Sequence, residues 1–146
     1  RHSGIGLRLN NGSHAEFAGS RMQGHSFAAL HLSGASACAC ESVFQDNPMA
    51  IFADCSSDMI LKASGLHGNR TGVKVDNRSS LSAVDSVFAK SSWDAVWCAG
   101  NAELDLKDCA FKDNRYGIKE DGPCHVQLAD VSFEGRHTEG HLRYPR

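Results

Sequence analysis

The chain has 146 residues, of which 41% are hydrophobic, enough for one domain with a buried core. Its formal net charge of −2 argues against binding to nucleic acid or to an anionic membrane surface. No apolar run is long enough to span a bilayer, so we expect a soluble protein. Because the chain starts at Arg1 rather than Met, we also expect it to be a segment of a longer protein or to need capping at its ends.

The predicted elements are short strands from one end of the chain to the other. Apolar and polar residues alternate at Leu7-Arg8-Leu9 and, further along, in the segments 30–32 (LHL), 73–75 (VKV), 103–108 (ELDLKD) and 125–130 (HVQLAD). This period of two is typical of a half-buried strand. Gly, Asn, Asp and Ser separate the segments and favour turns. No segment offers an amphipathic helix of useful length, so the sequence predicts an all-β protein.

Apolar anchor residues recur at a nearly fixed spacing along the chain. They are Met22, Phe44, Leu66, Phe88, Phe111 and Phe133, separated by 22, 22, 22, 23 and 22 positions. Two positions before them stand Ser20, Ser42, Ser64, Ser86, Cys109 and Val131, and three positions after them Asn recurs as Asn47, Asn69 and Asn114. Three short strands in each unit predict a right-handed parallel β-helix of about six coils of 22–23 residues.

Stacking of the coils has direct consequences for these repeated positions. Neighbouring coils of a parallel β-helix lie about 4.8 Å apart, so equivalent residues form ladders along the molecule. We therefore predict an internal ladder of Ser hydroxyls that Cys109 continues, and an asparagine ladder at one corner. Glu120 is the exception, because it stands at a position that is apolar in the other units.

The units FQDNPMAIF and FKDNRYGIK resemble the right-handed β-helix repeats of the pectate-lyase-like superfamily, which occur in carbohydrate-binding proteins and sugar hydrolases. The resemblance implies the fold, but the superfamily includes lyases, glycosidases and epimerases as well as non-enzymatic recognition modules. The Asn-Thr-Asp, Gly-His-Gly and Arg-Ile-Lys motifs of polygalacturonase-like enzymes and the Asp-Pro-His-Asp motif of alginate epimerases do not occur here. The nearly constant unit length also leaves no room for long loops that would wall a catalytic groove. We therefore favour a non-catalytic scaffold.

One outward column of side chains is the predicted ligand-binding face. It consists of the residues between the two apolar positions that open each unit, namely Arg8, His31, Phe52, Lys74, Trp97 and Lys119. Aromatic rings can lie against sugar rings or apolar side chains, and the cations attract anionic groups. We expect an extended polysaccharide or a protein partner on this face. The alternative is an ordinary solvated face whose lysine stems cover the sheet.

The neighbouring column carries the alternative function, that of a carbohydrate-active enzyme. It contains Asn10, Ser33, Asp54, Asp76, Ala99 and Asp121. Asp54 and Asp76 lie on adjacent coils, so their carboxylates can approach to about 5 Å, near the separation in retaining glycosidases. With Lys74 as a base they are the candidate catalytic residues of a lyase, hydrolase or epimerase acting on an acidic polysaccharide. The pair would also suit Ca²⁺, or it serves only the turn.

The cysteines and histidines predict no metal site. The six cysteines contain no CxxC pair and no zinc-finger spacing to histidine, and most are expected to fill space as small residues. The histidines are scattered over different turns and strands and are interpreted as surface residues. Exposed thiols at Cys38 and Cys40 favour an intracellular location, whereas sequons at Asn11, Asn69 and Asn77 favour secretion, so the compartment stays open.

Two features predict contacts with other molecules. Cys38 and Cys40 belong to an apolar outer patch with Ile60, Val84, Val43 and Val87, which is typical of a contact surface. A β-helix also has open ends with unpaired strand edges, so we expect end-to-end or side-by-side assembly, and HLRYPR from His141 can begin a further coil.

Overall fold

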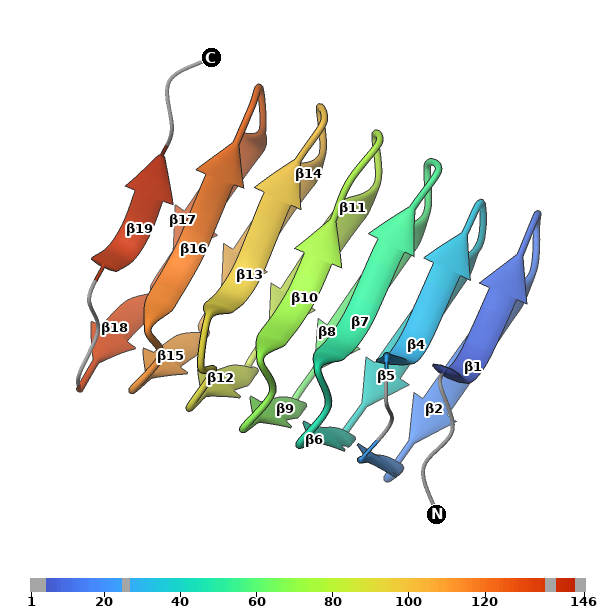
Figure 1. Cartoon of the computed structure of the whole chain (residues 1–146), viewed down its shortest axis with the longest axis horizontal. Helices are drawn as coiled ribbons and strands as arrows, with labels where there is room; N and C mark the ends of the chain where they lie inside the picture. Colours follow the sequence, from blue (N-terminus) through green and yellow to red (C-terminus); the bar gives the residue numbers. More distant parts are fainter. Residues whose placement is uncertain (1–4, 25–26, 136–138, 144–146) are drawn as a thin grey trace.

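The computed structural model describes residues 5–24, 27–135 and 139–143 of the chain. Its strands form three parallel sheets, and the chain visits each sheet once per coil (Figure 1). The seven-stranded sheet has the order β1 (Ile5–Asn10), β4 (Ala28–Ser33), β7 (Met49–Asp54), β10 (Thr71–Val75), β13 (Asp94–Ala99), β16 (Tyr116–Asp121) and β19 (Glu139–Arg143). This arrangement confirms the predicted all-β solenoid with three strands per coil and about six coils.

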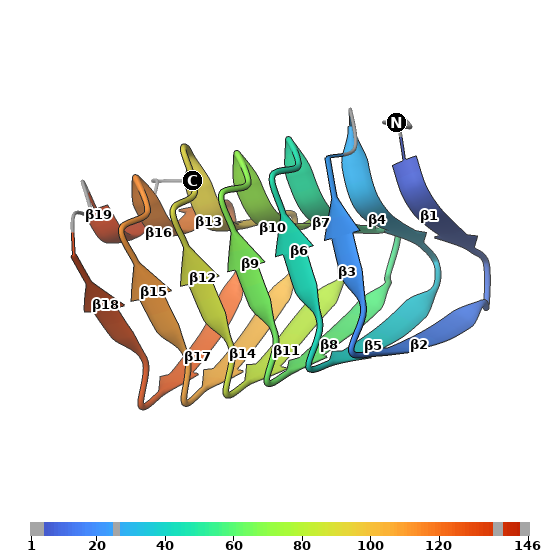
Figure 2. The same ribbon diagram turned by 90° about the horizontal axis from the view of Figure 1, so that it is seen from below.

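The two other sheets close the coil, as Figure 2 shows from below. The second sheet contains β2 (His14–Ala18), β5 (Ser36–Cys40), β8 (Asp58–Lys62), β11 (Ser80–Val84), β14 (Glu103–Lys107) and β17 (His125–Ala129). The third sheet contains β3 (Arg21–Gln23), β6 (Val43–Gln45), β9 (Gly65–His67), β12 (Val87–Ala89), β15 (Ala110–Lys112) and β18 (Ser132–Glu134). No helix in the described part of the chain is long and apolar enough to cross a membrane.

The corner between the second and third sheets turns on a single residue in the left-handed region. Its φ angle lies between 50° and 61° in the six coils, at Gly19, Glu41, Ala63, Asp85, Asp108 and Asp130. Gly and Asp tolerate this conformation, whereas Ala has neither the freedom of Gly nor a polar side chain that can bond locally. Ala63 therefore occupies its corner at a conformational cost.

The serine ladder begins directly after this corner and confirms the prediction. Ser42 Oγ accepts a hydrogen bond from the Ser20 amide of the preceding coil at 3.2 Å, and the same bond joins the next two pairs along the ladder. Cys109 continues the ladder, with Sγ 3.5 Å from the Ala83 carbonyl oxygen. The ladder satisfies backbone groups that would otherwise be buried without a partner.

The predicted asparagine ladder is present at the corner before the seven-stranded sheet. Asn69 Oδ1 accepts hydrogen bonds from the Asn47 backbone amide at 3.0 Å and from its Nδ2 at 3.1 Å. Asn69 Nδ2 donates to the Phe44 carbonyl at 3.0 Å, and Asn114 makes the equivalent bond to Phe88 at 2.8 Å. Asn69 is completely buried, as predicted, so its sequon offers no exposed amide.

The interior contains a stack of anchor residues enclosed by aliphatic side chains. Phe111 lies between Phe88 and Phe133, with ring centroids 4.7 and 4.9 Å away. Glu120 is buried at its predicted inward position, with 2% of its surface exposed. Cys98 and Cys124 form a disulfide. Cys98 and Cys109 are buried in the core, Cys38, Cys40 and Cys124 are half-buried and Cys55 is exposed, so fewer of the six cysteines fill space in the core than predicted.

In six strands of the seven-stranded sheet, β1, β4, β7, β10, β13 and β16, the second residue interrupts the regular alternation, and we call this position the bend. The bend residues, which are Gly6, Ala29, Ala50, Gly72, Ala95 and Gly117, are skipped in the pairing register between neighbouring strands. Ala29, Ala50 and Ala95 belong to the core. The residue before each bend therefore lies on the outer side of the sheet, which shifts the simple alternation expected from the sequence.

Candidate binding face on the seven-stranded sheet

The predicted outward column exists as one line of side chains across six strands. Adjacent members are register partners, in the order Arg8, His31, Phe52, Lys74, Trp97 and Lys119. The alignment expected from the sequence is thus confirmed, whereas the role of these residues in binding stays a prediction. We call this line the ring column.

Side chains of the ring column contact one another along the sheet. The His31 and Phe52 rings stack with centroids 4.8 Å apart and planes 2° from parallel. Lys74 Nζ lies 4.1 Å from the Trp97 ring centroid and 5.4 Å from that of Phe52, and Lys119 Nζ lies 4.7 Å from Trp97. Cation–π contacts of this kind are worth about 0.5–1 kcal/mol at exposed sites. They hold the cations above the aromatic surface.

His31 was interpreted from the sequence as a surface residue, but the structure buries most of its side chain. Only 9% of its surface is exposed, and neither ring nitrogen makes a hydrogen bond with a described residue. Burial lowers the pKa of His31, and the positive charge of Arg8 lowers it further. The ring is therefore neutral at pH 7, and it supports Phe52 by stacking rather than adding a cation.

A second line of rings and cations lies where the strands enter the sheet. Arg115 Cζ is 4.2 Å from the Trp93 ring centroid and 5.3 Å from that of Tyr116. Trp93 and Tyr116 meet edge to face, with centroids 5.4 Å apart. None of these residues was assigned a role from the sequence, because Trp93 and Arg115 stand in the corners before β13 and β16 and Tyr116 is the first residue of β16, ahead of the alternating pattern.

A hollow of about 420 Å³ separates this second line from the ring column. It is lined by Phe27, Pro48, Met49, Arg70, Thr71, Trp93 and Trp97. Phe27 is 45% exposed, the highest value among the exposed large apolar side chains Phe27, Ile60 and Leu128 of the described residues. Arg70 is exposed and has no ion pair within the described residues. The hollow thus combines aromatic walls with an unneutralised guanidinium group.

The distribution of aromatic residues distinguishes this face from the rest of the molecule. Within the described ranges, five Phe side chains pack in the core, at Phe17, Phe44, Phe88, Phe111 and Phe133. The other described Phe, Trp and Tyr residues are Phe27, Phe52, Trp93, Trp97 and Tyr116, all on or beside the outer face of the seven-stranded sheet. The outer faces of the two other sheets therefore carry no Phe, Trp or Tyr in the described part of the chain.

Asp94 is the functional candidate that sequence reasoning missed most clearly. It is completely buried, and neither carboxylate oxygen has a hydrogen bond with a described residue. Burial raises the pKa of Asp94 to about 6, although the positive charge of Lys119 acts in the opposite direction. A carboxylate without hydrogen-bond partners is rare in a buried position, and such groups often occur at functional sites.

Asp54 and Asp76 lie on adjacent coils, as expected, but their carboxylates serve the turns. Asp54 Oδ1 accepts hydrogen bonds from the Cys55 amide and from Asn77 Nδ2, and Asp76 Oδ1 accepts one from the Asn77 amide. In the described residues no third Asp, Glu, His or Cys joins them in a metal-binding group. The geometry fits the turn interpretation, and catalysis or Ca²⁺ binding by this pair, with Lys74 as base, stays a prediction.

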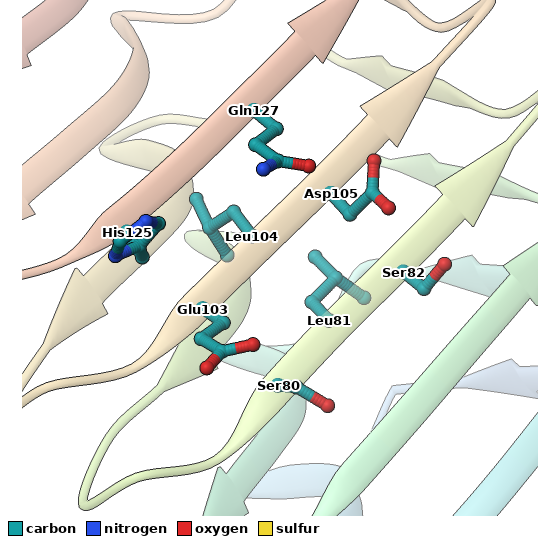
Figure 3. A pocket seen from close by; sticks show the side chains of 8 residues that line it. All are labelled: Ser80, Leu81, Ser82, Glu103, Leu104, Asp105, His125 and Gln127. Carbon is teal, nitrogen blue, oxygen red and sulfur yellow. The ribbon is translucent and has the colours of Figure 1, made fainter.

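Another hollow, of about 240 Å³, lies on the second sheet (Figure 3). Its polar lining comes from three adjacent strands and consists of Ser80, Ser82, Glu103, Asp105, His125 and Gln127. It has two carboxylates, no lysine or arginine and no aromatic wall other than the His125 ring. This hollow is therefore less suited to sugar rings or anionic groups than the hollow beside Trp97.

The predicted apolar patch is divided between two sheets. Cys38 and Ile60 are register partners on the second sheet, where Ile60 is 37% exposed. Val43 and Val87 lie on the third sheet, on either side of Gly65, and line a hollow of about 360 Å³. The patch is thus less continuous than the sequence indicated.

Three parallel sheets wound around a phenylalanine stack, with serine and asparagine ladders at the corners, define a parallel β-solenoid with a ring-bearing outer face. The family model described as "Right handed beta helix region" matches residues 1–136. The chain belongs to this right-handed β-helix family. No curated protein and no solved structure matches it. The family defines the fold, and the function has to be argued from the face itself.

Proposed function

We propose that this protein is a non-catalytic recognition module that binds an extended anionic polysaccharide on the outer face of its seven-stranded sheet. The observation that carries the proposal is the segregation of the outward Phe, Trp and Tyr side chains on this face, together with cations. Aromatic faces pack against sugar rings, and Arg and Lys side chains pair with carboxylate or sulfate groups.

The charges of the face support an anionic ligand. Arg8, Arg70, Lys74 and Arg115 have no ion pair with any described residue. The formal net charge of the whole chain is −2, so these cations are concentrated locally rather than being part of a basic protein. A positive strip of this kind attracts a polyanion and makes its binding sensitive to salt.

The shape of the face supports binding without turnover. The ring column repeats its contacts from strand to strand at about 4.8 Å, which suits a linear ligand with repeated groups. The face is open apart from the hollow between Trp93 and Trp97, and short corners flank the sheet. An enzyme would need groups that wall the substrate and exclude water.

The test is incubation with polygalacturonate, alginate, a sulfated polysaccharide and a neutral glucan, recording both retention and new chain ends. We expect retention on the acidic polymers, no new chain ends, and release by salt. Trp97→Ala and Arg70→Ala should each weaken retention roughly tenfold, because they remove a wall and an unpaired cation of the hollow. Lys62→Ala on the second sheet is the matched control.

Two outcomes would contradict the proposal. Cleavage that disappears in Asp54→Ala or Asp76→Ala would make the protein a carbohydrate-active enzyme. Failure to bind any of the acidic polymers would refute a polysaccharide ligand and favour a protein partner on the same face.

A further inference from the structure

The binding face contains one carboxylic acid group that the proposed contacts do not use. Asp94 directly follows Trp93, which lines the hollow, and it begins β13 as the register partner of Tyr116 on β16. Its carboxyl group also interacts electrostatically with Lys119 of the ring column. Its side chain is completely buried and its two oxygens have no hydrogen-bond partner in the described structure. A carboxylate held in this way is costly when ionised.

The strands on either side of Asp94 contain both cations and acids. The two neighbouring strands and the corner residues before them contribute Arg70, Lys74 and Asp76 on one side and Arg115, Tyr116, Lys119, Glu120 and Asp121 on the other. Glu120 is buried on the inner side, and Asp76 and Asp121 lie at the opposite ends of the strands. On β13 itself Cys98 is in a disulfide and does not titrate. Lys119 attracts the Asp94 carboxylate.

We propose that Asp94 regulates the attraction of the face for anions, since its ionised form cancels one positive charge beside the hollow and its protonated form leaves that charge in place. The proposal rests on the proposed function, because it adds a control to the same face. It names Asp94 as the residue that makes recognition of an acidic polysaccharide stronger in mildly acidic solution.

The charge of Asp94 changes within a narrow range of pH. Because burial raises the pKa of Asp94 to about 6, the carboxyl group is largely ionised at pH 7.5 and largely protonated at pH 5. His31 is the other titrating group of the ring column, and its pKa is lowered from 6.5, so it gains charge at a lower pH than an exposed histidine. Two strands, β7 and β10, lie between His31 and Trp97 in the ring column, so the two effects can be resolved by substitution.

The chain provides its own probe of this charge. Its two tryptophans, Trp93 and Trp97, both line the hollow, so tryptophan fluorescence reports on this face alone. Quenching by iodide depends on the local concentration of an anion, whereas quenching by neutral acrylamide depends only on access. One unit charge at about 5–10 Å changes the local anion concentration by roughly 1.5- to 2-fold at 0.1 M salt.

We expect the iodide quenching constant of the wild type to rise about 1.5- to 2-fold from pH 7.5 to pH 5, with the acrylamide constant unchanged. Asp94→Asn should show the higher iodide value at both pH values, and His31→Gln should keep the wild-type rise. Caesium quenching of the wild type should fall over the same range, a reading that needs no variant. An iodide constant that does not change with pH, or that rises equally in Asp94→Asn, would overturn the proposal.

This experiment contains no polysaccharide, so its result is separate from the proposed function. A pH-dependent iodide signal without retention on acidic polymers would refute the polysaccharide ligand and leave the control by Asp94 in place. Retention on acidic polymers together with an iodide quenching constant that does not change with pH would support the polysaccharide ligand and refute the control by Asp94.

Discussion

Because Asp94 is buried, the stability of the protein should depend on pH, and Asp94→Asn should remove this part of the pH dependence. The pKa of this group is about 6 in the folded protein and 3.8 as its ordinary value. A carboxyl group whose folded pKa is raised contributes full stability below the unfolded pKa and loses it as the pH rises through the folded pKa. The window is therefore about pH 4 to 7, and the loss is about 3 kcal/mol, from roughly 1.4 kcal/mol per unit of pKa.

The assay is urea unfolding of wild type and Asp94→Asn between pH 3.5 and pH 8. Asparagine stays neutral, so the free energy of unfolding of the variant relative to wild type should increase by about 3 kcal/mol over this range. His31 and His67 have lowered pKa values and act in the opposite sense, because they destabilise the fold as the pH falls. Both are present in the two proteins, so their contributions cancel in the difference.

The informative quantity is how the difference in unfolding free energy between the two proteins changes with pH, not its value at any one pH. Asparagine also has unpaired polar atoms at this position, so its stability at pH 4 can lie below that of the wild type. Asp105→Asn, on the exposed face of the second sheet, is the control for the general effect of losing one carboxylate. A constant difference between wild type and Asp94→Asn from pH 3.5 to pH 8 would refute the burial of an unpartnered acid at this site.

Three further substitutions test the fold. Ala63→Gly should stabilise the protein by about 0.5–1 kcal/mol in urea unfolding, because glycine adopts the φ of 50° without strain. The control Ala129→Gly, in strand β17, should destabilise it. Equal effects of the two substitutions would contradict the corner assignment. Asn69→Ala should cost about 2–4 kcal/mol, since it leaves buried groups unpaired, and the exposed Asn10→Ala should change little; similar small effects would mean that the ladder does not form. Phe88→Ala should lower stability by about 3–5 kcal/mol through the cavity in the ring stack, and a loss below 1 kcal/mol would count against that stack.

The repeat made most of the fold predictable. In a parallel solenoid each coil pairs in register with the next, so residues 22 positions apart become spatial neighbours without knowledge of distant contacts. Ser42 and Ser64, or Phe52 and Lys74, could therefore be placed side by side from the spacing alone, and the structure confirms both pairs. Register is fixed because a slip of one residue would turn the apolar side chains outward.

The bend in the seven-stranded sheet explains what was missed. Simple alternation assigns Asp94 to the same side as Val96, yet the bend at Ala95 moves it to the outer side. The periodicity also gave no reason to connect Arg70 and Trp93 with the ring column, because both stand in corners. Their approach to Trp97 depends on the direction in which each corner leads into the sheet, and that direction is a property of the backbone rather than of the residue pattern.

The disulfide could not be predicted from the sequence, for a different reason. Cys98 and Cys124 are 26 residues apart, a separation that differs from the period of the coil. Cys98 occupies a strand position and Cys124 a corner, so no ladder predicts their contact. The spacing that identified Ser and Asn partners therefore gave no indication of this pair.

The most direct test of the account is the dissociation constant of polygalacturonate for wild type, Arg70→Ala and Lys62→Ala, measured by tryptophan fluorescence at pH 6 and two salt concentrations. We expect saturable binding that weakens with salt, a roughly tenfold loss of affinity in Arg70→Ala, and no loss in Lys62→Ala. Equal affinities for Arg70→Ala and Lys62→Ala, or no binding by the wild type, would contradict recognition of an anionic polysaccharide by the seven-stranded sheet.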